Sequence, residues 1–221
     1  MRLQLAIDTL TLAEAEGLVA RVGDLVDVVE VGTPLIIREG VGAVRRLRAA
    51  FPDAVLLADL KIADGGHLEA ALGLDAGARI VTVLAAAADA TIREVVRAAR
   101  ERGGEVMVDL MGVEDLARRA REVDALGADY VCLHTAVDVQ AGHADLAGAT
   151  LQGLRRVKAA LDTARTAVAG GITLASCPAV AALAPDVVVV GSALTGAADP
   201  RAAAAAIRGA LRRQGDGGRA P

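Results

Sequence analysis

The residues best suited to chemistry stand in one short stretch, Asp59, Lys61 and Asp64, which comes directly after an apolar run. Asp59 and Lys61 are two positions apart, so on a β-strand their side chains point to the same side. Asp64 follows in a loop, where Gly65 and Gly66 let the backbone turn freely. Two acids and a lysine are costly to bury unless they pair or bind something. Spacing alone leaves open a catalytic site or a surface ion pair at a strand end.

Polar residues also end the other apolar runs of the chain. In order, these ends carry Asp8, Glu30, Asp59 with Lys61, Asp109, His134, Gly170-Gly171 and Gly191-Ser192. Taken singly, each could be an ordinary surface residue that terminates a strand. Barrel active sites lie at the carboxyl ends of parallel strands. Acids and bases at the same end of successive strands therefore favour a functional site.

The elements that position these residues follow a regular rhythm. Short Val/Ile/Leu runs alternate with Ala/Arg/Glu-rich stretches, which indicates βα units and a parallel sheet. We expect strands near residues 3–8, 26–31, 55–61, 80–84, 106–109, 130–134, 167–169 and 187–190, and helices that begin near Thr11, Gly40, Gly66, Asp89, Val113, Leu151, Thr173 and Pro200. Eight such units predict an α/β fold of the (β/α)₈ TIM barrel type. The main rival, a doubly wound open sheet, lacks a strand-following GxGxxG motif here.

Composition narrows the class of protein. The chain of 221 residues is 54% hydrophobic but only 1% aromatic, so Ala, Val, Leu and Ile must build the core. We expect one barrel domain over residues 1–213 and a disordered tail over 214–221. The net charge of -4 and the lack of a dense basic run argue against nucleic acid as a partner. No signal peptide or membrane-length apolar run is evident, which predicts a cytoplasmic protein without a membrane partner.

Glu30 and Asp59 are candidate metal ligands, because they come from neighbouring predicted strands and offer two carboxylates. Such a pair, with room for water, suits Mg²⁺, which keeps part of its hydration shell and often binds substrate oxygens. Mn²⁺ also favours oxygen ligands and is the alternative metal. An ion pair of Lys61 with Glu30 or Asp59, without metal, is a second interpretation, and the two are compatible. Zinc is not expected, since no His/Cys pair has ligand spacing.

Two short glycine-rich turns, at residues 169–173 and 190–193, lead into predicted helices. Small residues there let backbone N–H groups approach a phosphate at a helix N-terminus. Barrels often bind phosphate at the loops after strands seven and eight. Tight turns without a ligand are the simpler interpretation, but the paired location favours a phosphate site at Gly170, Gly171, Gly191 and Ser192.

His134 ends an apolar strand and could act as a general base or acid near neutral pH. His67 and His143 are weaker candidates, expected on a helix surface and in a polar loop. Cys132 is expected to be a small core residue, and Cys177 to stand at a helix start.

These residues together carry a family resemblance. Asp59-x-Lys61-x-x-Asp64 matches the signature of the orotidine-phosphate decarboxylase suprafamily, and the chain most resembles its 3-hexulose-6-phosphate synthase branch. The supporting stretches are 3–8, 29–36 with Glu30-x-Gly32-Thr33-Pro34, 81–84, 106–110, His134-Thr135, 169–172 and 194–197. The resemblance implies a ribulose-phosphate-binding (β/α)₈ barrel that forms a homodimer with shared active sites.

The implied reaction is a Mg²⁺-dependent aldol condensation of formaldehyde with D-ribulose 5-phosphate, which passes through an enediolate and also runs in reverse. By matched motif, Glu30 and Asp59 would hold Mg²⁺. Asp8 and Lys61 would contact the sugar phosphate, and Asp64 would reach into the partner subunit's site.

The resemblance also assigns proton transfer and phosphate binding. His134 and Asp109 occupy the positions associated with proton transfer, and either could be the base. Gly171, Gly191 and Ser192 would hold the phosphate of the substrate.

Other functions stay open. A 3-keto-L-gulonate-6-phosphate decarboxylase is the nearest alternative, but that branch typically carries an arginine in the loop after the sixth strand, and residues 134–138 contain none. Orotidine-phosphate decarboxylase is less favoured, because its motif continues differently after Asp64. A ribulose-phosphate epimerase would use several metal-binding histidines at strand ends. A sugar-phosphate-binding barrel without catalysis is the alternative of another class.

Several positions depart from the synthase pattern: His67 stands where an acid is usual, Ala85 and Ala136 where glycine is common, and Ser192 where a second glycine is common. These departures touch loops that would shape the substrate pocket. They leave the metal and proton-transfer positions intact, so the reaction class is better supported than the exact substrate.

Overall fold

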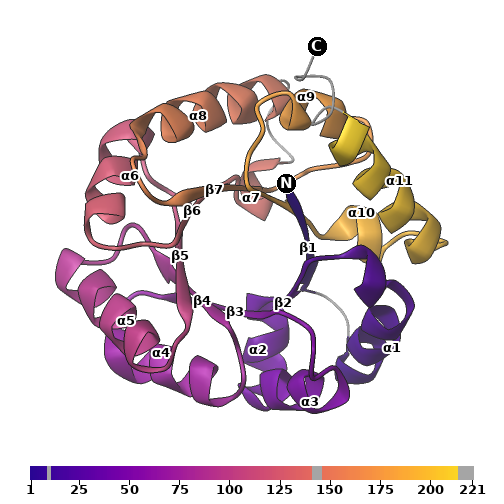
Figure 1. The fold of residues 1–221 in the computed structure, drawn as a ribbon, viewed down its shortest axis with the longest axis horizontal. Helices are drawn as coiled ribbons and strands as arrows, with labels where there is room; N and C mark the ends of the chain where they lie inside the picture. Colours follow the sequence, from indigo (N-terminus) through magenta and orange to yellow (C-terminus); the bar gives the residue numbers. More distant parts are fainter. Residues whose placement is uncertain (9–10, 141–145, 214–221) are drawn as a thin grey trace, which may run out of the picture.

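The eight predicted strands close into a barrel. The structure, a computed structural model, describes residues 1–8, 11–140 and 146–213, and the predicted tail over 214–221 lies outside these residues. All neighbouring strands pair in parallel, and β8 pairs with β1 (Figure 1). The strands are β1 (Arg2–Ile7), β2 (Val28–Val31), β3 (Leu56–Ile62), β4 (Ile80–Leu84), β5 (Glu105–Asp109), β6 (Tyr130–His134), β7 (Arg165–Ala169) and β8 (Val187–Val190). The predicted TIM barrel is confirmed.

Helices surround the barrel on its outside, as the view down the barrel shows (Figure 1). They are α1 (Leu12–Val22), α2 (Thr33–Glu39), α3 (Gly42–Ala50), α4 (Gly66–Asp75), α5 (Asp89–Glu101), α6 (Leu116–Ala125), α7 (Val137–Gln140), α8 (Leu146–Ala160), α9 (Cys177–Ala181), α10 (Ser192–Thr195) and α11 (Pro200–Arg213), with a 3₁₀ turn η1 (Gly23–Leu25). The first helix begins next to Thr11, as predicted, with a capping box in which Thr11 and Glu14 exchange hydrogen bonds.

Two separate apolar clusters hold the barrel and its helices together. The larger lies between the strands and the helices; α5, for example, buries Ile92, Val95 and Ala99 on one face. The smaller fills the inside of the barrel with residues such as Leu57, Met107, Cys132 and Val189, together with Tyr130. Because the chain is poor in aromatic residues, aliphatic and small side chains do nearly all of this packing.

Aspartates that precede three strands fix the neighbouring strands in register. The side chain of Asp27, before β2, accepts a hydrogen bond from Leu3 N at 2.8 Å. Asp129, before β6, accepts from Val106 N at 2.8 Å, and Asp186, before β8, accepts from Thr166 N at 2.7 Å. Each carboxylate thus ties the start of one strand to a strand beside it.

Several helix starts differ from the sequence prediction. Gly40 does not begin a helix; with φ +67° it ends α2, a helix that the prediction missed because Pro34 resembles a loop residue but occupies the first turn. The helix expected from Val113 begins at Leu116 and is capped by Asp115. The helices expected from Leu151 and Thr173 begin at Leu146 and Cys177.

Strand β3 is irregular where the Asp/Lys motif stands. Its register with β4 shifts between Ala58 and Ile62, and Lys61 takes the left-handed conformation with φ +46°. The hydroxyl of Thr82 in β4 accepts a hydrogen bond from Lys61 N at 2.9 Å. Left-handed backbone costs a non-glycine residue about 1–2 kcal/mol, so the hydrogen bond and the contacts of its ammonium hold Lys61 in place.

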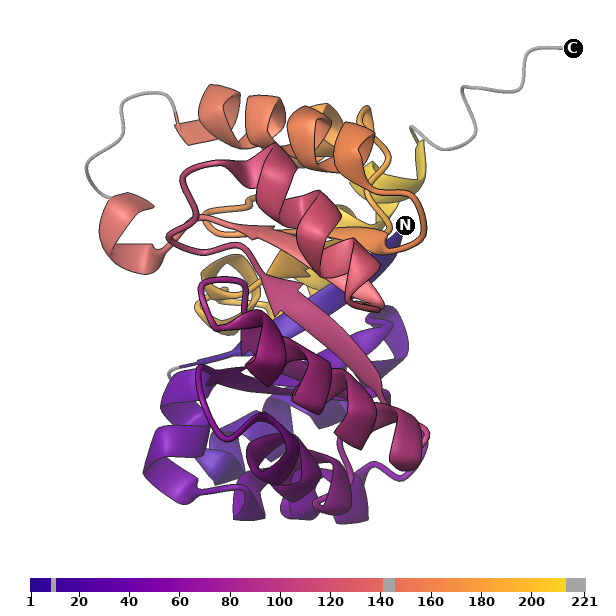
Figure 2. The same cartoon turned by 90° about the vertical axis from the view of Figure 1, so that its left-hand side faces the viewer.

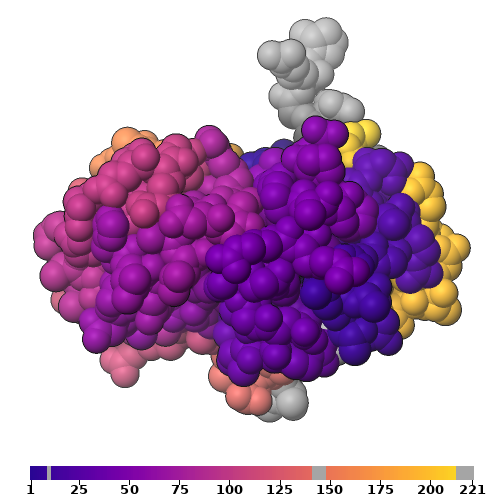
Figure 3. Space-filling model, turned by 90° about the horizontal axis from the view of Figure 1, so that it is seen from below, coloured from indigo at the N-terminus to yellow at the C-terminus, as the bar shows by residue number. Residues whose placement is uncertain are grey.

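The two ends of the barrel are distinct. In the side view, α7 lies at the left, at the carboxyl ends of the strands, while the N-terminus, where β1 begins, lies at the right (Figure 2). Figure 3 shows the face on which the purple to magenta helices α2, α3 and α4 meet solvent. Three large apolar side chains of α2 and α4 are exposed: Ile37 by 80%, Leu68 by 67% and Leu72 by 47%. Among the described residues, no helix has both the length and the apolarity needed to cross a membrane.

Candidate active site

A cavity of about 530 Å³ opens at the carboxyl ends of the strands. It brings together every residue that the sequence predicted for the site except Asp64. Those residues are Asp8, Glu30, Asp59, Lys61, Asp109, His134, Gly170, Gly171, Gly191 and Ser192. Seven of the eight βα units thus contribute these residues to one concave site, as expected for a barrel.

Lys61 lies at the centre of the charged group. Its Nζ atom is 2.8 Å from Asp59 Oδ2 and 3.2 Å from Asp109 Oδ2. Burial alone would lower the pKa of Lys61, but the charges of Asp59 and Asp109 outweigh it and raise that pKa above its ordinary value. Lys61 is therefore a protonated hydrogen-bond donor at neutral pH and not a free amine nucleophile. The ion pair of Lys61 with Asp59, an alternative raised by the sequence, is present.

Asp59 is 5% exposed and held by two threonines. Thr33 donates to Asp59 Oδ2 at 2.8 Å, and Thr82 donates to Asp59 Oδ1 at 2.7 Å. The Thr82 hydroxyl also accepts a hydrogen bond from Lys61 N, so a single hydroxyl connects the Asp59 carboxylate and the lysine backbone. Both threonines line the cavity, and the sequence analysis gave neither of them a role. Thr82 could have been found as a polar residue at an inward position of an apolar strand.

Glu30 is buried as well and is 8% exposed. Burial and repulsion from Asp59 raise its pKa well above the ordinary value, although a hydrogen bond of 2.7 Å from Gln4 Nε2 to Glu30 Oε2 opposes this. Burial and the charge of Asp59 likewise raise the pKa of Asp8. Acidic side chains that raise one another's pKa in a shared cavity are suited to a cation.

The absence of a side chain at Gly32 leaves room for the Asp8 carboxylate beside it. A side chain at position 32 would overlap Asp8 Oδ1 and approach the backbone oxygen of Ile7. The glycine of the Glu30-x-Gly32-Thr33-Pro34 stretch is thus required by close packing.

His134 and Asp109, the two residues predicted for proton transfer, are in direct contact. His134 Nδ1 lies 2.8 Å from Asp109 Oδ2, and Asp109 Oδ1 accepts from Met111 N at 2.9 Å. Burial alone would raise the pKa of Asp109, but the hydrogen bond and charge of His134, with the charge of Lys61, lower it below its ordinary value. Asp109 is therefore an ionised acceptor with both oxygens engaged, which makes it a poor proton acceptor.

The glycine turns after β7 and β8 also line the cavity. Gly170 and Gly171 have φ of +99° and +67°, and a side chain at Gly170 would collide with the backbone of Thr135. Gly191 leads directly into α10, which begins at Ser192. The turn after β7 differs from the prediction, because α9 begins only at Cys177.

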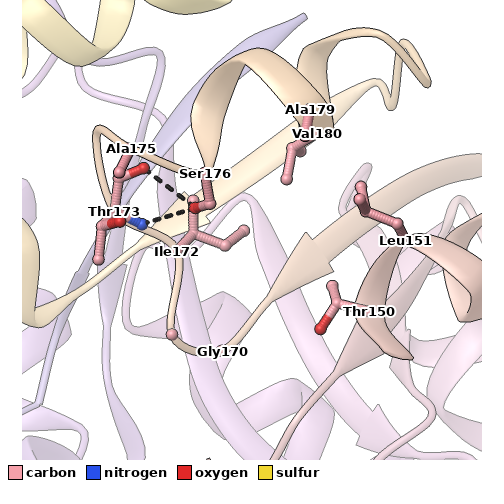
Figure 4. A pocket seen from close by; sticks show the side chains of 10 residues that line it. Thr150, Leu151, Gly170, Ile172, Thr173, Ala175, Ser176, Ala179 and Val180 are labelled. Carbon is pink, nitrogen blue, oxygen red and sulfur yellow. Dashed lines mark hydrogen bonds between the residues drawn. The ribbon is translucent and has the colours of Figure 1, made fainter. Parts of the chain in front are cut away.

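A second cavity of about 420 Å³ lies on the other side of the β7 turn, between α8 and α9 (Figure 4). It shares Gly170 and Gly171 with the charged cavity. Its lining is otherwise small or apolar, including Leu151, Ala179 and Val180. It contains none of the predicted acids or bases.

Asp64 and two histidines lie elsewhere. Asp64 is exposed, and its Oδ1 accepts from Gly65 N at 2.8 Å. His67 lies on α4 with Nε2 2.8 Å from Glu101 Oε2 of α5. His143 lies outside the described residues. Cys132 is buried, as predicted, and Cys177, which is also buried, stands at the predicted helix start, the first residue of α9.

The residues present fit a hard divalent cation. Glu30 and Asp59 supply carboxylate oxygens, and the buried Oε1 atom of Gln4 beside them has no partner within the described part of the chain. No group of three or more His, Cys, Asp or Glu there could hold a metal by itself. A cation would therefore complete its shell with water or substrate oxygens, which is typical of Mg²⁺.

Known proteins resemble this chain over nearly its whole length. The family model described as "Orotidine 5'-phosphate decarboxylase / HUMPS family" matches residues 1–207. The 3-hexulose-6-phosphate synthase of Bacillus subtilis is 45% identical over 90% of this chain and 93% of its own length, and that of Mycobacterium gastri is 45% identical over 96% and 100%.

Two solved structures are similar as well. The 3-hexulose-6-phosphate synthase from Salmonella typhimurium is 45% identical with a TM-score of 0.91, covering 97% of this chain and 100% of its own. The 3-keto-L-gulonate-6-phosphate decarboxylase from Vibrio cholerae is 29% identical with a TM-score of 0.81, covering 96% and 97%.

Proposed function

The chain belongs to the orotidine 5'-phosphate decarboxylase / HUMPS family, and on this premise we propose that it joins formaldehyde to D-ribulose 5-phosphate. The product is D-arabino-hex-3-ulose 6-phosphate, and the reaction is reversible. The curated relatives, at 41–45% identity, confirm the prediction of an enzyme of the aldolase type. The particular substrates, the metal and the roles of the residues are our proposal.

One observation carries this proposal: Lys61 lies between Asp59 and Asp109, and His134 binds the same oxygen of Asp109. A protein that only binds a sugar phosphate would not need a partly buried ammonium, two carboxylates and an imidazole in one connected group. Such a group does fit the removal of a proton next to a carbonyl.

The chemistry begins with proton abstraction. His134 takes a proton from C1 of D-ribulose 5-phosphate, and the electron pair of the broken C–H bond gives an enediolate. The Lys61 ammonium, beside this site, donates a hydrogen bond to the developing oxyanion. C1 then attacks the carbon of formaldehyde and forms the new C–C bond. The formaldehyde oxygen receives the proton from His134, so no proton is consumed overall.

We assign His134, rather than Asp109, as the base. Asp109 accepts three hydrogen bonds, from Lys61, His134 and Met111 N, and its pKa is lowered. Its role is to orient the imidazole through Nδ1, which leaves Nε2 available for proton transfer. Because hydrogen positions follow from the hydrogen-bond partners, this tautomer is set by the Asp109 contact.

Glu30 and Asp59 are the proposed ligands for Mg²⁺, with Mn²⁺ as the alternative. When bound, the cation would stabilise negative charge on adjacent substrate oxygens. The turns at Gly170, Gly171, Gly191 and Ser192 are proposed to hold the phosphate. Their place in the lining of the same cavity supports this, because their small side chains let backbone N–H groups approach a phosphate.

We also propose a homodimer in which Asp64 serves the neighbouring subunit's site. Asp64 does not line the cavity of its own chain, and it is exposed. The apolar side chains of Leu68 and Leu72, one turn apart on α4, follow it and are 67% and 47% exposed. Exposed apolar residues beside a functional loop support a protein interface there.

The test of the function is formaldehyde consumption with D-ribulose 5-phosphate and Mg²⁺. Wild type, Asp59→Asn and wild type without metal are compared. We expect consumption that needs the metal and collapses in Asp59→Asn. The absence of consumption by folded wild type would contradict the synthase proposal.

A parallel assay measures CO₂ release from 3-keto-L-gulonate 6-phosphate. We expect little release, because the described residues that line the cavity include no arginine. Efficient decarboxylation, with no formaldehyde consumption, would assign the chain to the decarboxylase branch instead.

A further inference from the structure

Gln4 is a buried polar residue on the inside of β1, and it lines the same cavity as Glu30 and Asp59. It is 1% exposed and pairs in register with Val28 of β2 and Val189 of β8. Both of these neighbours belong to the apolar cluster that fills the barrel. Burial of an amide in such surroundings is unfavourable unless its hydrogen bonds are made, so the contacts of Gln4 need an explanation.

Only one half of the Gln4 amide has a partner among the described residues. Its Nε2 donates to Glu30 Oε2 at 2.7 Å. Its Oε1 is buried without a hydrogen bond, and it is the only buried side-chain nitrogen or oxygen of the described residues in this state. An unmade hydrogen bond of this kind costs about 1–3 kcal/mol.

Turning the amide around would not remove the problem in a cation site. There Glu30 is ionised, and because an ionised carboxylate only accepts hydrogen bonds, the nitrogen of Gln4 must face it. The oxygen then needs a donor from outside the protein. Gln4 lines the cavity that contains Glu30 and Asp59, so a donor held in that cavity can supply the bond.

We propose that Gln4 is a positioning residue for a divalent cation held by Glu30 and Asp59. The Nε2 atom fixes the Glu30 carboxylate, and the Oε1 atom accepts a hydrogen bond from a water of the cation's hydration shell. Mg²⁺ keeps several waters when it binds proteins. Groups that orient ligands from outside the metal's own shell typically change metal affinity or activity by about 10–100-fold. The inference rests on the cation site of the proposed function.

The test measures metal affinity directly and does not depend on catalysis. Mn²⁺ is titrated into substrate-free protein, and free Mn²⁺ is followed by its electron paramagnetic resonance signal. Gln4→Met keeps the length of the side chain but removes both polar atoms. We expect its Mn²⁺ affinity to fall by about 10-fold or more. Met107→Leu, an apolar change in the same cavity lining, is the matched control and should bind as wild type does.

A second measurement distinguishes weaker metal binding from a general loss of stability in Gln4→Met. The Mn²⁺-induced rise in the midpoint of thermal unfolding should be smaller in Gln4→Met than in wild type, whatever the starting midpoint. If Gln4→Met does not fold, Gln4→Asn replaces it. Asn keeps the amide but withdraws it by one methylene, and the same weakening is expected.

Glu30→Gln separates this inference from the proposed function. Wild type that binds no Mn²⁺, or binds it as well as Glu30→Gln does, would overturn both the cation site and the role of Gln4. If Glu30→Gln weakens binding while Gln4→Met binds as wild type does, only the role of Gln4 is overturned. Gln4 would then be bonded to an ordinary buried water.

Discussion

The imidazole of His134 and the ammonium of Lys61 meet on one oxygen atom, Oδ2 of Asp109, at 2.8 Å and 3.2 Å. The carboxylate therefore couples the proposed base to the proposed hydrogen-bond donor. Neither group can move away without leaving the other as the main partner of the buried Asp109 carboxylate. The proposed proton transfer thus depends on this unit more than on any single side chain.

This coupling predicts that losses of activity at the two residues are not additive. His134→Ala should lower kcat by about 10²–10⁴-fold, the range typical of a general base. Asp109→Asn should also lower kcat strongly, because the imidazole loses its orienting acceptor. The double variant should be little worse than His134→Ala, since residues that act as a unit are non-additive.

Steady-state formaldehyde consumption measures these effects. His67→Ala is the matched control, because His67 lies on the outer face of α4 and contacts Glu101. It should keep wild-type kcat. Independent, multiplicative losses in the double variant would argue against the shared-oxygen arrangement.

The sequence predicted the barrel and most of the cavity for a simple physical reason. Each βα unit shows its own apolar strand, and closure of the barrel brings the strand ends together. The strand-end residues could thus be assigned to the cavity without knowledge of any long-range contact. Polar character at the end of an apolar run was sufficient for Asp8, Glu30, Asp109 and His134.

The supporting contacts could not be predicted in this way. Thr82 and Gln4 lie within strands, where a single polar residue between apolar ones gives no sign of its partner. The hydrogen bonds that define them join strands that are 21 and 26 residues apart in sequence. The left-handed backbone of Lys61 is likewise invisible in the sequence, because it arises from the register shift between β3 and β4.

Thr82 should therefore be required for the geometry of the Asp/Lys motif. Thr82→Val keeps the shape but loses the bonds to Lys61 N and Asp59 Oδ1. We expect kcat to fall by about 10-fold or more and stability to fall by about 1–3 kcal/mol, because a buried N–H loses its acceptor. Thr82→Ser retains the hydroxyl and should restore most of kcat. If Thr82→Val loses stability but keeps wild-type kcat, the hydroxyl serves the fold alone.

Asp124 should stabilise the opposite end of the barrel in a pH-dependent manner. It is 7% exposed on α6 and accepts hydrogen bonds from Asp162 N at 2.6 Å, Thr163 N at 3.1 Å, Thr163 Oγ1 at 2.6 Å and Ala164 N at 2.8 Å. Burial alone would raise its pKa, but these bonds lower it below the ordinary 3.8. Asp124→Ala should lower the free energy of unfolding by about 2–3 kcal/mol at neutral pH.

The sign of the pH dependence follows from the lowered pKa. The contribution of Asp124 is fully present above its unfolded-state pKa, near 3.8, and is lost as pH falls through the lower folded-state value. Urea unfolding of wild type and Asp124→Ala should thus differ by a constant amount near neutrality and converge below about pH 4. Asp53→Ala, at an exposed aspartate, is the control and should show little difference. A difference that grows in acid would contradict the assignment.

The proposal that Asp64 acts in the neighbouring subunit's active site can be tested by complementation. Asp64→Ala and His134→Ala should each be nearly inactive alone. If Asp64 acts in the neighbouring subunit's site, a hybrid dimer contains one site with both residues intact and one with neither. Random mixing of equal amounts makes half of the dimers hybrid, so about a quarter of wild-type activity should return.

The recovery must depend on subunit exchange. It should appear after co-expression or after reversible dissociation of the mixed variants, and sedimentation should show a dimer. Leu68→Glu with Leu72→Glu places charges on the exposed apolar residues of α4 and should shift the protein toward monomer and abolish recovery. Mixing Asp109→Asn with His134→Ala is the matched control. Both residues line the cavity of the same chain, so no hybrid site has both intact and no activity should return. Activity in that control, or none in the Asp64 mixture, would mean that Asp64 does not act across the interface.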